Sequence, residues 1–249
     1  MSLFASAIRR SFGHKPYKGH SSQWIQRHTT DPYVQRAQQD MYRSRAAYKL
    51  KQMDQQYSIF TKKSVVIDIG CFAGSWSQVA MAKTGAATGK SNALVIGVDL
   101  VEMDPLDHHH FVRGDIREVG TLRKIDELLR GRKASIVLSD MAPRMTGSRI
   151  DDHIASVDLS KAALRCATNF LQEGGWFVLK VFQGGMLDRF KAELTEHFGK
   201  IRTSKPKASR PESVEVYLVC SDFLGPGGAG AVRAGGAVGA ATRTKQDLG

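Results

Sequence analysis

The sequence predicts an α/β protein of the doubly wound, Rossmann-like type, with a seven-stranded, mostly parallel sheet and one antiparallel strand near the C-terminus. Short β-branched and apolar runs alternate along the chain with segments whose apolar residues recur at helical spacing. This alternation is typical of parallel strands joined by crossover helices. The last two apolar runs follow each other without a helix between them, which favours an antiparallel hairpin. No internal repeat is visible, so a repeat architecture is not expected.

Strands are expected where β-branched and apolar residues form short, continuous runs. The first is SVVIDI at 64–69, and the second is ALVIGVD at 93–99. Runs of this kind are typical of strands that are covered on both faces of the sheet. The remaining strands are expected at HFVRGD (110–115), ASIVLSD (134–140), WFVLKVF (176–182), IRTSKP (201–206) and VEVYLVC (214–220).

Helices are expected between these strands, at 75–84, 118–130, 154–172 and 185–198. The second of them places four apolar residues on one face: Val119, Leu122, Ile125 and Leu129. Such a stripe is what a helix needs in order to pack against a sheet. Gly174 and Gly175 are expected to stop the third helix, because glycine readily follows a helix C-terminus.

The two ends of the chain differ from this alternating region. Residues 1–30 contain no Asp or Glu, and Phe4, Ile8 and Phe12 recur every fourth residue among several arginines. This pattern predicts a mitochondrial presequence, with a basic RNA-contacting arm as the alternative. Residues 224–249 are rich in Gly and Ala and poor in large apolar side chains, which predicts a flexible tail. One folded domain is therefore expected at 31–223.

The chain is strongly basic, with a formal net charge of +12 and a pI near 9.8. Lys and Arg neutralise phosphates and release counterions, so this excess favours a polyanionic partner such as RNA. A basic leader adds charge without implying RNA, so charge alone does not decide. No stretch approaches the roughly 18 apolar residues needed to span a bilayer, and no membrane partner is expected.

A metal site and a disulfide framework are not expected either. The three cysteines, Cys71, Cys166 and Cys220, lie far apart and form no CxxC pair. The run of His108, His109 and His110 is a poor chelate, because adjacent residues of a strand point to alternate sides. We interpret this run as a basic turn.

Candidate ligand-binding residues lie where strands end, because open α/β sheets bind ligands beyond the carboxyl ends of their strands. The first strand runs into Gly70 and Gly74, which permit a tight turn and a close approach of the backbone to a ligand. Asp99 ends the second strand and can accept both hydroxyls of a ribose. Asp115 ends the third, where a carboxylate can reach an adenine amino group. Each feature alone is also ordinary turn chemistry, but together they predict an adenosine site, and the turn lacks the G-x-G-x-x-G of dinucleotide folds.

The candidate reacting centre combines two charged residues. Asp140 ends the fourth strand, in SDMAP, and Lys180 lies inside FVLKVF of the fifth strand. Lysine is almost never fully buried unless it is paired, and a desolvated lysine can serve as a base. The alternative is a strand-edge lysine whose ammonium reaches water. The expected interior position of the strand argues against that alternative.

These motifs resemble those of the FtsJ-type (RrmJ-like) ribosomal RNA 2′-O-methyltransferases. The matching segments occur in order, at family-like spacing, from about residue 40 to about residue 220. They are RSRAAYKL (43–50), DIGCFAGSWSQ (68–78), VDLVEMDP (98–105), GD (114–115), SDMAP (139–143), LKVFQG (179–184) and SRPESVEVYLV (209–219).

The resemblance implies S-adenosylmethionine as cofactor, no metal, and a catalytic tetrad of Lys49, Asp140, Lys180 and Glu215. Glu212, three residues before Glu215, is interpreted as a glutamate outside the tetrad. Cofactor contacts are expected at Gly70, Gly74, Trp76, Asp99, Asp115 and Asp140. The sequence departs from the family at Ala73, where Pro is frequent, and at Arg144, where Asn is common. Neither change removes a tetrad residue.

Two basic groups flank the tetrad positions and are expected to form a rim that binds RNA phosphates. The first group is Arg43, Arg45, Lys49 and Lys51, and the second is Lys205, Lys207 and Arg210. The alternative is two solvated charge runs.

Within the family, WIQRHTTDPYVQRA and KPKASRPESVEVYLV most resemble the mitochondrial members. Together with the acid-free leader, they predict a protein of the mitochondrial matrix that methylates a uridine in the A-loop of the large-subunit rRNA, within an assembling mitoribosomal particle. Two alternatives stay open: a tRNA 2′-O-methyltransferase of the same family, and an rRNA-binding assembly factor that makes little use of its methylation site. A dinucleotide-dependent oxidoreductase leaves Lys180 and Glu215 unexplained.

Overall fold

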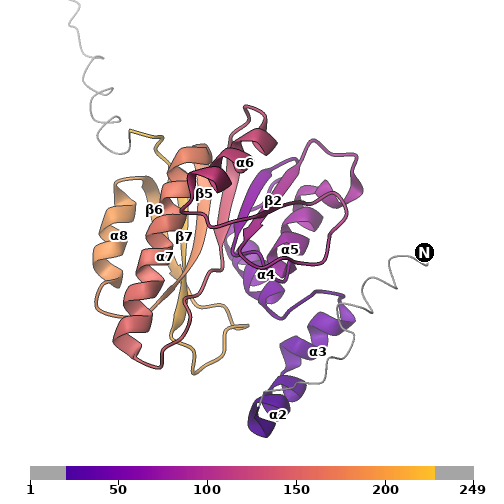
Figure 1. Cartoon of the computed structure of the whole chain (residues 1–249), viewed down its shortest axis with the longest axis vertical. Helices are drawn as coiled ribbons and strands as arrows, with labels where there is room; N and C mark the ends of the chain where they lie inside the picture. The colour runs from indigo at the N-terminus through magenta and orange to yellow at the C-terminus, as the bar shows by residue number, and fades with distance from the viewer. Residues whose placement is uncertain (1–20, 228–249) are drawn as a thin grey trace, which may run out of the picture.

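The computed structural model describes residues 21–227, which fold around one seven-stranded sheet (Figure 1). The strand order is β3-β2-β1-β4-β5-β7-β6. Neighbouring strands from β3 to β5 are parallel, whereas β7 runs antiparallel to both β5 and β6. The predicted mostly parallel sheet with one antiparallel strand near the C-terminus is therefore confirmed, as is the closing hairpin.

The elements keep close to the predicted alternation of strands and helices. The strands are β1 (Val65–Ile69), β2 (Leu94–Asp99), β3 (His110–Arg113), β4 (Ala134–Ser139), β5 (Leu171–Phe182), β6 (Phe198–Ser204) and β7 (Glu215–Phe223). The helices are α2 (Ser22–Thr30), α3 (Pro32–Gln39), α4 (Ala46–Tyr57), α5 (Ser75–Thr84), α6 (Val119–Leu129), α7 (Arg149–Phe170) and α8 (Leu187–Thr195), with a short 3-10 turn at Ala86–Thr88.

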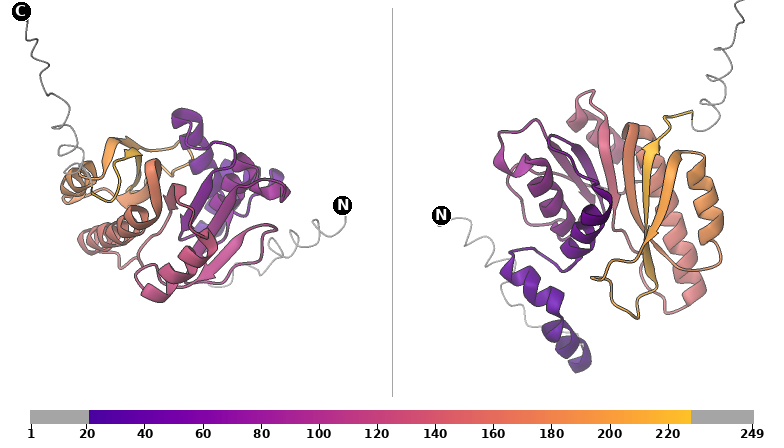
Figure 2. Two further views of the ribbon diagram at one scale, coloured as in Figure 1. Left: turned by 90° about the horizontal axis from the view of Figure 1, so that it is seen from above. Right: turned by 180° about the vertical axis from the view of Figure 1, so that it is seen from behind.

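Helices cover both faces of the sheet, and successive strand residues pack on opposite faces (Figure 2). On β1, Ile67 packs with the core under α6, α7 and α8, whereas Val66 packs with the core under α4 and α5. The same alternation holds on β5, where Leu179 joins the first core and Val178 the second. Side chains on the face of the sheet covered by α4 and α5 can therefore contact one another at the carboxyl ends of the strands without contacting α7, which covers the other face.

The boundaries of α7 and β5 differ from the sequence prediction. The helix begins at Arg149, earlier than predicted, because the side chain of Ser148 accepts a hydrogen bond from the Asp151 N–H and caps the helix. The helix ends at Phe170, and the chain enters β5 directly. The expectation that Gly174 and Gly175 stop the helix is therefore wrong. They lie within β5, at a register shift opposite Ala134–Ile136, where β5 has three more residues than β4.

The segment before β1 contains three helices that the strand-and-helix alternation did not predict. Asp31 accepts hydrogen bonds from the Tyr33 and Val34 N–H groups and so caps α3. Helix α4 packs against α5, whereas α2 and α3 lie away from the sheet (Figures 1 and 2). Phe4, Ile8 and Phe12 lie outside the described residues, as do residues 228–249. The predicted leader, tail and domain limits stay predictions.

The described residues contain neither a membrane-spanning helix nor a disulfide bond. Among residues 21–227, no helix is long and apolar enough to cross a membrane. The three cysteines are buried and not joined by a disulfide: Cys71, Cys166 and Cys220. Burial raises the pKa of each thiol, to about 12 for Cys166, which keeps these groups protonated.

Candidate active site

Lys180 and Asp140 form a close pair at the carboxyl edge of β4 and β5. The Lys180 ammonium lies 3.0 Å from Asp140 Oδ1 and donates a 2.6 Å hydrogen bond to the Asp140 backbone oxygen. The Lys180 side chain is only 9% exposed, so this charge is stabilised by its partners and not by water. The paired, largely buried lysine predicted from FVLKVF is present, and the strand-edge alternative is not.

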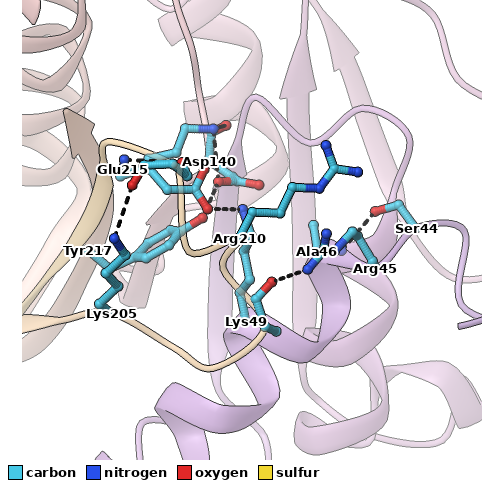
Figure 3. A network of polar contacts seen from close by, with 12 residues as sticks. Ser44, Arg45, Ala46, Lys49, Asp140, Lys205, Arg210, Glu215 and Tyr217 are labelled. Atoms are coloured by element: carbon cyan, nitrogen blue, oxygen red, sulfur yellow. Dashed lines mark hydrogen bonds and ion pairs between the residues drawn. The ribbon is translucent and has the colours of Figure 1, made fainter. Parts of the chain in front are cut away.

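Lys49 and Glu215 form a second pair beside the first (Figure 3). Lys49 Nζ lies 2.5 Å from Glu215 Oε1, and both side chains are mostly buried. Helix α4 supplies the lysine and the first residue of β7 supplies the glutamate. The structure thus brings together all four predicted tetrad residues as two lysine–carboxylate pairs.

Tyr217 joins the two pairs, and sequence reasoning did not single it out. Its hydroxyl donates a 2.9 Å hydrogen bond to Asp140 Oδ1, and Lys49 Nζ lies 5.6 Å from the centre of its ring. The residue is fully buried. Burial, more than the nearby carboxylates, raises the pKa of the hydroxyl well above its usual value and keeps it a donor. Its position two residues after Glu215, on the same face of β7, was the available signal.

A cavity of about 300 Å³ opens beyond the carboxyl ends of β1, β2 and β4 and reaches Asp140. Three carboxylates and several apolar side chains line it. The apolar residues suit a planar base, and the carboxylates suit the hydroxyls and positive charges of a charged nucleoside. The lining residues that matter here are Gly70, Asp99, Asp115, Arg117, Asp140 and Met141.

The backbone conformation of Gly70 and the orientation of the Asp99 carboxylate both suit a ligand in this cavity. Gly70 has a positive φ of 73°, and a Cβ there would lie 2.6 Å from Met141 Cγ, so no larger residue fits. The Asp99 carboxylate accepts the N–H of Phe72 at 3.0 Å and that of Val101 at 2.9 Å, one on each oxygen. These bonds fix its orientation and leave further lone pairs for a ligand. The turn-cap interpretation of Asp99 is therefore correct and compatible with ligand binding.

Asp115 also lines the cavity, but Arg117 already engages it. The Arg117 guanidinium donates to both carboxylate oxygens, with Nη2 to Oδ2 at 2.5 Å. Hydrogen bonds from Arg117 hold the pKa of Asp115 below its usual value. Arg117 also lines the cavity and was missed by sequence reasoning, although its place two residues after Asp115 in GDIR was visible.

Trp76 and Gly74 lie near the cavity but do not line it in this structure. The Trp76 side chain is buried, donates from Nε1 to the Ala46 backbone oxygen, and packs on Tyr217 with ring centres 5.7 Å apart. Gly74 precedes α5, and a Cβ there would lie 2.9 Å from Arg43 Nη1. Their predicted cofactor contacts stay predictions, and their visible role is to position α4, α5 and β7.

Asp68 is a completely buried carboxyl group beneath this turn. Ser77 donates to its Oδ2 at 2.7 Å, whereas Oδ1 has no hydrogen-bond partner among the described residues. Burial raises the pKa of Asp68 to about 7, and the carboxylates of Asp140 and Asp99 add to the effect. A negative charge at Asp68 is therefore unfavourable unless a positive group approaches.

The predicted phosphate rim is only partly available for RNA. Arg43 donates to the backbone oxygens of Ala73, Asp104 and Pro105, so it holds loops together. Arg45 pairs with Asp31 and donates to the Ala208 oxygen. These two arginines are structural, contrary to the rim expected from the sequence.

A second cavity, of about 400 Å³, lies between the start of α4 and the β6–β7 loop. Charged residues of both signs line it: Arg45, Lys49, Arg210, Glu212 and Glu215. Figure 3 shows Arg210 and Lys49 near this loop. The cavity adjoins the Lys49–Glu215 pair, and Asp140 is not among its lining residues.

Within residues 21–227, no group of three His, Cys, Asp or Glu side chains could hold a metal ion. His108 and His110 are exposed, whereas His109 packs against Gly97. Burial lowers the pKa of His109 to about 4, so this residue is neutral near pH 7. The interpretation of the three histidines as a basic turn is therefore wrong for His109.

The comparisons with known proteins identify the family of the chain. The sequence model of FtsJ-like methyltransferases matches residues 42–223. The chain belongs to this family. Proteins named ribosomal RNA large subunit methyltransferase E are similar to it: that of Acinetobacter baumannii is 41% identical over 199 residues, covering 80% of this chain and 90% of the relative. That of Chromobacterium violaceum is 42% identical over 199 residues, covering 80% and 95%.

A crystal structure described as a ribosomal RNA methyltransferase from Plasmodium falciparum has the same fold. It is 35% identical, with a TM-score of 0.67, and the match covers 74% of this chain and 100% of that one. As an FtsJ-like methyltransferase, the chain uses S-adenosylmethionine as its cofactor. The cavity fits this cofactor, because Asp99 can hold ribose hydroxyls and the Asp140 carboxylate can face a sulfonium.

Proposed function

We propose that this FtsJ-like methyltransferase transfers a methyl group from S-adenosylmethionine to a ribose 2′-hydroxyl of large-subunit ribosomal RNA. The observation that carries the proposal is the Lys180–Asp140 pair at the end of the cofactor cavity, with Lys49 and Glu215 alongside. Relatives that cover most of the chain are named for methylating large-subunit rRNA. A net charge of +12 suits a polyanionic substrate.

The residues of this chain act on the acceptor hydroxyl. When bound, S-adenosylmethionine supplies an electrophilic methyl group on a sulfonium. The Lys180 ammonium has three N–H donors, and Asp140 occupies two of them through its carboxylate and its backbone oxygen. The third donor is left for the ribose oxygen. We infer that this ammonium steers the oxygen into line with the methyl carbon. Because an ammonium has no lone pair, the hydroxyl proton passes to solvent as the bond from the oxygen to the methyl carbon forms and the carbon–sulfur bond breaks.

Lys49 and Glu215 serve the acceptor side in this proposal. Their pair lies between Tyr217 and the second cavity, where the strand that carries the reacting ribose can enter. Glu215 neutralises Lys49 and holds it over the Tyr217 ring, and Lys49 remains able to donate to the RNA backbone.

We further propose that the target is a uridine of the A-loop in mitochondrial large-subunit rRNA, methylated in the matrix within an assembling particle. The support comes from the sequence: the acid-free residues 1–30, and the two segments WIQRHTTDPYVQRA and KPKASRPESVEVYLV that resemble the mitochondrial members. A fusion of residues 1–30 to a reporter should enter mitochondria. A cytosolic fusion would contradict the localisation and favour the RNA-contacting arm.

The proposed reaction is tested by single-turnover transfer of labelled methyl to large-subunit rRNA, to an immature large-subunit particle and to tRNA. Mapping of 2′-O-methyl sites in mitochondrial rRNA, with and without the protein, identifies the nucleotide. Transfer to tRNA alone would redirect the proposal to the tRNA enzymes of the family. Tight rRNA binding with no transfer to any RNA would instead favour an assembly factor.

A further inference from the structure

His153, in the first turns of α7, is a buried histidine whose two ring nitrogens are both engaged. Nδ1 lies 3.0 Å from the backbone oxygen of Phe182, and the Met186 N–H lies 3.0 Å from Nε2. Because Nε2 accepts from an N–H, it carries no proton, and the proton lies on Nδ1 and is donated to Phe182. The ring is thus a neutral bridge between two backbone groups.

Those backbone groups lie on either side of the exposed turn that follows β5. Gln183, Gly184 and Gly185 are exposed, whereas His153 beneath them is 6% exposed. A Cβ on Gly184 would lie 2.4 Å from the ring, so the turn rests directly on His153. At Gly185 a Cβ would meet nothing within 4 Å. Position 184 therefore requires glycine because of His153, and position 185 does not.

The turn follows the strand that carries Lys180, leads into α8, and contacts the start of the strand that carries Glu215. Phe182 is two residues after Lys180 and is the register partner of Glu215 on β7. The Gln183 N–H donates a 2.8 Å hydrogen bond to the oxygen of Val214, next to Glu215. A shift of the turn would therefore change the spacing between Lys180 and Glu215.

Two serines of α7 hold the same strand end. The Ser156 hydroxyl accepts the Phe182 N–H at 3.0 Å. The Ser160 hydroxyl shares its donor between the Ser156 backbone oxygen at 2.9 Å and the Lys180 backbone oxygen at 3.2 Å. Together with His153 they make a buried polar stripe on a helix face that otherwise packs in an apolar core. Buried polar groups are tolerated when hydrogen-bonded, and they fix one geometry where apolar contacts would allow several.

We propose that His153 is a positioning residue for methyl transfer. It lies on the face of the sheet covered by α7 and fixes the Gln183–Met186 turn. Through this turn it sets the spacing of Lys180 and Glu215, whose side chains lie on the opposite face. The proposal rests on the proposed function, because it concerns the acceptor side of that reaction. His153 lines neither the cofactor cavity nor the cavity beside Lys49. It acts on the acceptor geometry and not on cofactor binding.

Three substitutions separate the hydrogen bonds of His153 from its volume. His153→Phe fills the space and leaves the Phe182 oxygen and the Met186 N–H without partners. His153→Gln places an amide oxygen near the Nε2 position and keeps an acceptor for Met186. His153→Asn places an amide nitrogen near the Nδ1 position and keeps only the donor to Phe182.

We expect His153→Phe to lower single-turnover methyl transfer by about ten- to a hundredfold, because a misplacement of about 1 Å can reduce a rate by about a hundredfold. Cofactor affinity should stay within about twofold of wild type, because the cofactor cavity is untouched. His153→Gln should restore the rate to within about threefold, and His153→Asn should lie between. A merely structural role would lower stability without this order of rates.

Amide hydrogen exchange in the full chain gives a readout that does not depend on activity. Exchange at Gln183–Met186 should be at least about tenfold faster in His153→Phe and unchanged at β1. Gly184→Ala should reproduce the effect, and Gly185→Ala, its matched control, should not. Wild-type transfer and wild-type exchange in His153→Phe would overturn the inference. If wild type methylates no RNA, the proposed function fails, and the exchange comparison still decides whether His153 holds the turn.

Discussion

The Tyr217 hydroxyl donates a hydrogen bond to Asp140 Oδ1 at 2.9 Å, and the backbone of Tyr217 is in register with that of Lys180. Asp140 Oδ1 thus lies within reach of both Lys180 and Tyr217, while the Tyr217 ring underlies Lys49. One buried side chain therefore fixes both lysine–carboxylate pairs. The site is a single network, so removing any one member should affect its neighbours.

Tyr217→Phe tests how much this link contributes. The ring stays, so packing against Trp76 is preserved, and only the hydroxyl that donates to Asp140 is lost. We expect stability to fall by about 1 kcal/mol, the usual contribution of one hydrogen bond. Transfer should fall by only about three- to tenfold, because Lys180 still contacts Asp140. Urea denaturation and single-turnover kinetics measure the two effects, and a loss as large as that of Lys180→Ala would contradict the positioning role of Tyr217.

Lys180→Ala should abolish the reaction while leaving binding nearly intact. The ammonium is the group placed to hold the reacting oxygen, so its contribution is realised mainly in the transition state. We expect a fall of about a thousandfold or more in transfer, with affinities for cofactor and RNA within a few-fold of wild type. Lys180→Arg should not rescue the rate, because the planar guanidinium does not fit the site of a compact ammonium. Unimpaired transfer by Lys180→Ala would remove the mechanism.

Glu215 and Glu212 form a matched pair of carboxylates three residues apart. Glu215→Ala leaves the mostly buried Lys49 ammonium without its carboxylate, which should lower stability by about 1–3 kcal/mol and slow transfer less than Lys180→Ala does. Glu212→Ala should change stability little, because Glu212 is exposed, and should slow transfer much less than Glu215→Ala, because Glu212 is not part of the Lys49–Glu215 pair. Thermal denaturation and single-turnover transfer compare the two. Equal effects of the two substitutions would contradict the assignment of Glu215 to the tetrad.

Asp99→Ala should weaken cofactor binding without affecting RNA affinity. The carboxylate is oriented by the Phe72 and Val101 N–H groups and faces the cavity, where it can accept ribose hydroxyls. Hydrogen bonds to a charged group contribute about 1.5–3 kcal/mol, so we expect affinity to fall by roughly ten- to a hundredfold. Calorimetry with S-adenosylmethionine, without added metal, measures the change. NAD is the control ligand, and binding of NAD without S-adenosylmethionine would contradict the adenosine-donor assignment.

Much of the fold could be predicted from the sequence because strand runs and helix stripes repeat with distinct periods. The end of β2 at Asp99 and the bounds of α5 were predicted to the residue. The α7–β5 junction was not, because Gly174 is equally compatible with a helix stop and with a bulge. Pairing with β4 decides between them, and pairing across the sheet is not a local property of the sequence.

The tetrad positions were predicted by motif, but the contacts that hold them were not. Arg43 and Arg45 are basic residues of the kind that bind phosphates. In the folded chain, however, their guanidinium groups already donate to backbone oxygens, and Arg45 also pairs with Asp31. Arg117 and Tyr217 carry no motif of their own, and their roles follow from where Asp115 and Asp140 come to lie. Charge and spacing identify which side chains can act, whereas their partners depend on the folded chain.

Asp68→Asn should remove part of the pH dependence of stability. The pKa of Asp68 is raised from 3.8 to about 7 by its complete burial, so the folded state holds a proton that the unfolded state has released. Stability from this group is fully present below about pH 4 and is lost as the pH rises towards 7. Asn has the shape of the protonated carboxyl group and can still accept from Ser77. It does not titrate.

The difference in unfolding free energy between Asp68→Asn and wild type is therefore the informative quantity, because titrating groups that do not interact with Asp68 contribute equally to both proteins. We expect the Asn variant to gain stability relative to wild type as the pH rises from about 4 to about 7, and the difference to level off above that range. Urea denaturation at several pH values measures it. The Ser77→Ala variant is the control: it removes the hydrogen bond that favours the charged form, so the loss of stability with pH should extend to higher pH than in wild type. A difference that does not change with pH would show that folding does not raise the pKa of Asp68 and that the carboxylate is ionised in the folded protein.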